Sequence, residues 1–67
     1  MKPKYHNVRL RVSSLDSNAL CIVGTVCAAL RKAGVGPGEV EAFASDAMSS
    51  DYNHLLRTTM RWVKLVD

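Results

Sequence analysis

A run of apolar residues over positions 19–30 (ALCIVGTVCAAL) is the feature that most limits how this chain folds. The run is too short to cross a bilayer, which takes about 20 apolar residues. Within it and just beyond, one stripe recurs at helical spacing: Ala19, Ile22, Val23, Val26, Leu30 and Ala33. Because further apolar residues lie off that stripe, we expect a helix over residues 18–33 that is either central to its fold or shared with a second copy.

Polar and glycine residues mark both ends of this helix. Ser17 or Asn18 offers a side-chain oxygen to the open amides at its start. Gly34 can adopt the left-handed conformation that closes a helix, and Val35 can fold back as the apolar partner of that cap. Gly24 in the middle costs roughly 1 kcal/mol relative to alanine, so we expect another backbone to approach closely there.

Alternating residues near both ends of the chain predict two strands. In residues 6–12 the apolar side chains Val8, Leu10 and Val12 alternate with polar ones, which is the period of a half-buried strand. Residues 62–66 alternate again, with Val63 and Leu65 opposite the others. We expect residues 1–5 to form a loosely ordered tail.

Two amphipathic helices are predicted between residue 36 and the second strand. Pro37 suits the first turn of the earlier helix, because its missing amide has no partner there. Asp51 favours the start of the later one. The order strand, helix, helix, helix, strand predicts one α+β domain over residues 1–67, with a two-stranded sheet packed on the helices. A strand edge could accept a second copy, so dimerisation is a further expectation.

The cysteines and histidines are too sparse for a disulfide or a metal site. Cys21 and Cys27 are six residues apart on one helix, about 240° around its axis, and cannot bridge each other. Together with His6 and His54 they lack the spacing that zinc requires, so we expect no metal and no cofactor. Reduced thiols indicate the cytoplasm. A secretory leader is the alternative, but Asp16 and the strand-like start argue against it.

Two polar segments invite a catalytic or ligand-binding interpretation. His54 and Asp51 are three residues apart at a helix start and could form a general acid/base pair, but helix capping explains them with fewer assumptions. The glycines of residues 34–38 resemble a phosphate loop, yet no Lys-Ser/Thr pair follows. The segment is also explained if one helix ends at Gly34 and the next begins at Pro37. We therefore expect no enzyme.

Charge is distributed unevenly, which predicts two candidate binding surfaces. The first lies on the outward face of the strands and comprises Arg9, Arg11, Trp62 and Lys64. Cations beside an aromatic ring are what a single-stranded nucleic-acid platform uses. The second is acidic, suits a basic patch on a protein, and comprises Glu39, Glu41, Asp46 and Asp51. For both surfaces the alternative is that the charged side chains only face the solvent and bind no partner.

Several short motifs resemble a family of small uncharacterised proteins of bacteria, phages and mobile elements. The likeness covers about residues 8–65. It rests on Ser17-Asn18-Ala19, Ile22, Gly24, Val26, Ala29-Leu30-Arg31, Ala33-Gly34-Val35, Asp51-Tyr52, His54-Leu55-Leu56 and Met60-Arg61-Trp62-Val63. The family pattern has glycine where this chain has Ser17 and Ser50, and aspartate in place of Asn53. No activity is attached to the family. The resemblance implies a compact intracellular domain and favours a mobile-element role, such as modulating a host protein.

The leading functional hypothesis is a small non-catalytic protein-interaction module. The chain has more apolar helix surface than one small core needs, and it lacks a recognisable group of catalytic residues. The first alternative is a nucleic-acid-binding accessory protein that uses the basic strand face. The second alternative is a housekeeping domain that acts as a homodimer. No membrane partner is expected.

Overall fold

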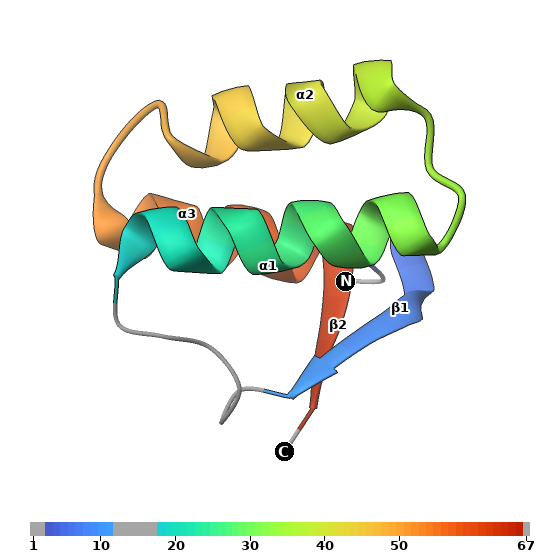
Figure 1. Cartoon of the computed structure of the whole chain (residues 1–67). Helices are drawn as coiled ribbons and strands as arrows, with labels where there is room; N and C mark the ends of the chain where they lie inside the picture. The colour runs from blue at the N-terminus through green and yellow to red at the C-terminus, as the bar shows by residue number, and fades with distance from the viewer. Residues whose placement is uncertain (1–2, 12–17, 67) are drawn as a thin grey trace.

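Two strands from opposite ends of the chain pair with each other, and three helices connect them (Figure 1). The computed structural model describes residues 3–11 and 18–66. The elements are β1 (Tyr5–Arg11), α1 (Ala19–Lys32), α2 (Pro37–Ala47), α3 (Tyr52–Trp62) and β2 (Val63–Val66). This confirms the predicted α+β domain with the order strand, helix, helix, helix, strand.

The two-stranded sheet is parallel. Arg9 pairs with Lys64, Leu10 with Leu65 and Arg11 with Val66, and the register is irregular between Tyr5 and Arg9. Parallel strands need a long crossover connection, which the three helices provide here. The predicted inward position of Val8 is confirmed, because that side chain is buried. Val12 lies outside the described residues.

Both ends of α1 form as the sequence predicts. The Asn18 side chain accepts a hydrogen bond from the Leu20 amide, whereas Ser17 lies outside the described residues. At the other end the Val35 amide donates to the Leu30 carbonyl and the Gly34 amide donates to the Arg31 carbonyl. This pair of bonds is a Schellman motif. Gly34 supplies the positive φ of 87° that the motif needs.

The prediction for Gly24 is wrong. Within residues 3–11 and 18–66 no other segment comes within 4 Å of a Cβ built at Gly24, so no backbone of this part of the chain approaches it closely. The residue lies on the exposed side of α1, facing away from the core. Sequence spacing shows that a glycine is present in a helix, but it does not show whether another element covers that side.

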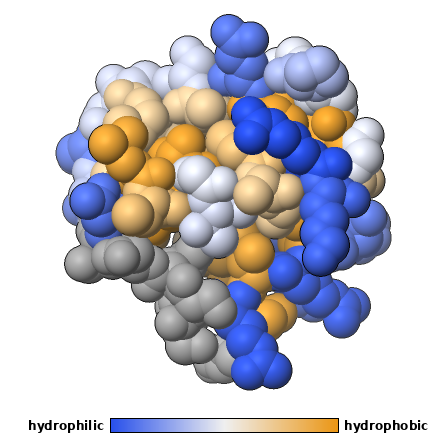
Figure 2. Space-filling view, in the orientation of Figure 1, coloured by the Kyte–Doolittle hydropathy of each residue, from blue (hydrophilic) through white to orange (hydrophobic). Residues whose placement is uncertain are grey.

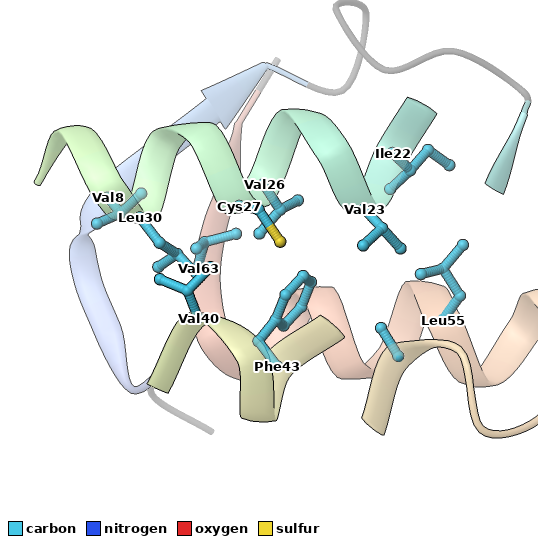
Figure 3. Packing of buried hydrophobic residues seen from close by; sticks show 11 residues of the cluster. Val8, Ile22, Val23, Val26, Cys27, Leu30, Val40, Phe43, Leu55 and Val63 are labelled. Carbon is cyan, nitrogen blue, oxygen red and sulfur yellow. The ribbon is translucent and has the colours of Figure 1, made fainter. Parts of the chain in front are cut away.

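The core lies between α1, the other two helices and the sheet (Figure 3). Ile22, Val26 and Leu30 from α1 are completely buried, and they face Phe43 of α2 and Leu55 of α3. Thr58 and Thr59 are also buried, and the Thr59 hydroxyl donates to the Leu55 carbonyl within its own helix. Among the described residues no buried side-chain polar atom lacks a partner.

The boundary between α3 and β2 differs from the prediction. Trp62 was expected to begin the strand, but it is the last residue of α3, and β2 starts at Val63. The Val63 amide still donates to the Thr59 carbonyl, so the helix passes directly into the strand without a loop. At the start of the chain, β1 begins at Tyr5, one residue before the predicted start.

None of the helices in residues 3–11 and 18–66 is long and apolar enough to cross a membrane.

The open space around Gly24 generates a prediction. Gly24→Ala should raise the free energy of unfolding by about 0.5–1 kcal/mol, because alanine orders the helix backbone at a lower entropic cost and its methyl group meets no neighbour. Urea denaturation followed by circular dichroism measures this change.

Gly34→Ala is the matched control, with the same added methyl group and equally open space. It should lower the free energy of unfolding by about 1–2 kcal/mol, because residues with a Cβ are strained at positive φ. A destabilising Gly24→Ala would contradict the open environment described for that position.

Candidate binding surfaces

Three cations lie together on the outward side of the sheet. We call Arg9, Arg11 and Lys64 the basic strand face. Arg9 is paired with Lys64 across the two strands, and Arg11 follows two residues after Arg9 on the same side. All three are exposed, whereas Val8 and Val63 beside them point into the core. This arrangement places three positive charges on one exposed face of the sheet.

Trp62 does not lie with these cations. Its ring stacks on Tyr5 at a centroid distance of 5.8 Å and meets the buried Phe43 edge to face at 5.6 Å. The Lys4 ammonium lies 4.6 Å from the Trp62 ring centroid. Because Phe43 belongs to the core, Trp62 is on the helix side of the sheet. The structure thus joins Arg9, Arg11 and Lys64 but separates the aromatic ring from them.

Trp62 instead belongs to a cluster that attaches the start of the chain to α2. The Lys4 ammonium forms an ion pair with Glu39, and the Tyr5 hydroxyl donates to the same carboxylate at 3.0 Å. The Lys4 amide also donates to the Arg61 carbonyl at 2.7 Å. Lys4 and Tyr5, placed by the sequence in a terminal tail, are therefore anchored by long-range contacts.

These contacts shift the pKa values of the cluster. Hydrogen bonds from Lys4 and then Tyr5 lower the pKa of Glu39 below its ordinary 4.5. The hydrogen bond from Lys4 to Glu39 raises the pKa of Lys4. The pKa of Tyr5 is raised first by desolvation and then by its own hydrogen bond to Glu39. The Lys4 and Glu39 side chains stay about half exposed, so solvent weakens their attraction.

The four acidic candidates do not form one free surface. Glu39 is half-buried in the cluster just described. Asp51 caps α3 through a 2.9 Å hydrogen bond from the His54 amide. Asp46 lies 3.3 Å from the His54 ring. Glu41 is exposed and takes part in no ion pair within the described part of the chain.

His54 connects the end of α2 to the start of α3. Its Nε2 atom lies 3.0 Å from the Asp46 carbonyl and 3.3 Å from the hydroxyls of Ser49 and Thr58. A carbonyl oxygen only accepts, so Nε2 is the donor in that contact. The Asp51 carboxylate bonds the His54 backbone and not its ring. The arrangement is thus a helix junction, and it does not align the two residues as an acid/base pair.

The glycine segment is explained by two helix ends. Gly34 closes α1, and Gly36 in extended conformation precedes Pro37 at the start of α2. The Gly36 carbonyl accepts hydrogen bonds from the Glu39 and Val40 amides. A structural role thus accounts for this segment.

The cysteines are free and lie in different environments. Cys21 is exposed and Cys27 is buried. Burial raises the pKa of the Cys27 thiol, which disfavours the reactive thiolate. In the described residues no three histidine, cysteine or acidic side chains are placed to hold a metal ion together.

A pocket that the sequence does not predict lies at the end of the helical layer where α2 turns into α3. We call it the end pocket. Its volume is about 100 Å³, and it is lined by Ala19, Ala47, Met48, Ser50, Asp51, Tyr52 and Leu55. These residues come from α1, α2, α3 and the turn between α2 and α3, so no single periodic stripe reveals the pocket. The only local signal is that Met48 and Tyr52 are large apolar residues beside a predicted turn, and both are exposed.

Comparisons with protein-family models, with curated proteins and with solved structures give no match. The site is therefore interpreted from its own chemistry.

The contacts of Glu39 with Lys4 and Tyr5 predict that the stability of the protein depends on pH. Because its folded pKa is lowered, Glu39 stabilises the protein above pH 4.5, and this contribution is lost as the pH falls through the lower folded pKa. The urea concentration at the midpoint of unfolding should fall as the pH is lowered through this range, and it should fall less in Glu39→Gln than in the wild-type protein. Glu41→Gln, on the same helix, is the control and should retain the wild-type profile. Identical profiles for all three proteins would contradict the predicted role of Glu39.

The His54 junction predicts a change in stability without a change in binding. His54→Ala should lower the free energy of unfolding by about 0.5–1.5 kcal/mol, because it removes the polar contacts that join the His54 ring of α3 to Asp46 of α2. Asn53→Ala, at an exposed neighbour, should change it by less than about 0.5 kcal/mol. Urea denaturation compares the two variants. A folded His54→Ala protein that fails to bind its partner would instead indicate a functional histidine.

Proposed function

We propose that this protein is a small non-catalytic binding module that recognises an acidic segment of a partner protein through the basic strand face. The observation that carries this proposal is the pairing of Arg9 with Lys64 on an exposed surface, with Arg11 beside them. The four acids in the described residues lie on α2 or at the start of α3, and none forms an ion pair with these cations. An acidic partner would relieve their mutual repulsion.

The form of the sheet supports an extended partner. Each strand pairs on one side only within the described part of the chain, so each has an edge without a strand partner. An extended peptide can add to such an edge through backbone hydrogen bonds, while its side chains reach those of the neighbouring strand. Acidic side chains on alternate positions of the peptide would meet Arg9 and Arg11, which occupy alternate positions of β1.

Nucleic acid is the second candidate, because phosphates are attracted by the same three cations. Single-stranded nucleic acid is also bound by aromatic rings on which its bases stack. Trp62 is occupied by Tyr5, Phe43 and Lys4, which makes it unsuitable for that role. This difference favours an acidic protein segment over a nucleic acid.

The resemblance to proteins of phages and mobile elements supports a more specific role, in which the module binds and modulates a host protein in the cytoplasm. A homodimer with no other partner is the remaining alternative. It is supported by the exposure of Leu20, which is 68% accessible on the first turn of α1.

A titration with two anionic probes tests the proposal. A glutamate-rich peptide should bind the wild-type chain, and replacing Arg9, Arg11 and Lys64 together with threonine should weaken its binding by about tenfold or more at low salt. Replacing Arg31, Lys32 and Arg57 with glutamine is the matched control, because it removes the same charge from exposed helix positions. It should leave the affinity nearly unchanged. Equal losses in both variants would indicate non-specific attraction.

The second probe is an oligo-dT strand, with the fluorescence of Trp62 as the readout, since Trp62 is the one tryptophan of the chain. We expect no stacking-induced quenching. Tight binding of oligo-dT that quenches Trp62, with no binding of the glutamate-rich peptide, would support the nucleic-acid alternative. Sizing the purified protein with and without nuclease treatment would show whether it carries nucleic acid or forms a dimer.

A further inference from the structure

The end pocket combines a concave shape with apolar side chains that remain exposed. Met48 and Tyr52 are 47% and 44% exposed, and both line the pocket. Ala47 and Leu55, at its base, are buried in the core. Scattered apolar residues are common on protein surfaces, but apolar residues around a concavity are characteristic of a binding site. Figure 2 also shows hydrophobic residues over part of the face that α1 presents.

The size of the pocket determines the class of ligand. Its volume of about 100 Å³ is well below the range of roughly 300–1,000 Å³ typical of cofactor and small-molecule sites. It is large enough for one aliphatic side chain. Protein interfaces concentrate their binding energy in a few such anchors that are buried in pockets on the partner. The occupant that fits is therefore a single side chain from another protein.

The charges around the pocket determine the character of the segment that carries this side chain. Asp51 lines the pocket, and Asp46 precedes the lining residue Ala47 on α2. No lysine or arginine is among the lining residues, and the last turn of α2 carries Asp46 and no base. A segment with cations on both sides of its anchor would thus find complementary charge at this end of the molecule.

We infer that the end pocket binds a basic segment of a partner protein and buries one of its aliphatic side chains against Met48, Tyr52 and Leu55. This site uses different residues and the opposite charge from the basic strand face, so it does not rest on the proposed function. Either surface can bind while the other does not. A partner that engages both would carry an acidic and a basic segment.

Three twelve-residue peptides test the inference by titration of the ¹⁵N-labelled full chain. The first is lysine-rich with one central leucine, the second has alanine in place of that leucine, and the third is glutamate-rich with the leucine retained. The first should shift the amide resonances of Ala19, Ser50 and Leu55. The alanine peptide should bind about tenfold more weakly, as expected for the loss of one buried aliphatic side chain.

Matched variants locate the site. Met48→Ser should weaken the binding of the lysine-rich leucine peptide several-fold, whereas Met60→Ser should not. Met60 is the same apolar residue and is 59% exposed, but it does not line the pocket. Asp51→Asn should weaken the binding of this peptide about two- to threefold at low salt while the asparagine still caps α3. Glu41→Gln removes the same charge outside the pocket and should have no effect.

Four results would overturn the inference. They are equal binding of the leucine and alanine peptides, equal loss in Met48→Ser and Met60→Ser, stronger binding of the glutamate-rich peptide at these resonances, and no shift at a peptide concentration of about 1 mM. Circular dichroism of each variant shows that it remains folded, so a lost interaction is not confused with unfolding.

Discussion

The burial of α1 is the constraint on which the rest of the structure depends. Ile22, Val26 and Leu30 are completely inaccessible to solvent, and a chain of 67 residues has few other elements with which to cover them. α2 and α3 each contribute an apolar stripe to this task, and the sheet closes the remaining side through Val8 and Val63. The helices thus form both the core and the crossover that parallel strands require.

The second organising contact is between the start of the chain and its middle. Tyr5 reaches Glu39, 34 residues away, and stacks on Trp62 just before β2. These contacts hold β1 beside β2 and against α2 at the same time. They also occupy the Trp62 ring and one of the acids of α2, which removes both from the surfaces that would otherwise bind ligands.

The two candidate surfaces differ in sign and in shape. The basic strand face is exposed and regular, and its cations follow the pairing of the two strands. The end pocket is concave and largely apolar, and Asp51 lines it at the junction of α2 and α3. The internal contacts of Asp51 and His54 build the junction between α2 and α3.

Local patterns in the sequence determined the elements of this fold, their order and most of their ends, because side-chain periodicity and helix capping depend on residues a few positions apart. Asn18 and Gly34 illustrate this for α1. The outward placement of Arg9, Arg11 and Lys64 follows in the same way from alternation along each strand. Only the tertiary structure decided that Trp62 ends a helix and packs on Tyr5 and Phe43, that Gly24 faces open space, and that residues from three helices enclose a pocket. Each of these features depends on which distant segment lies beside a residue, and periodicity along the chain carries no information about that.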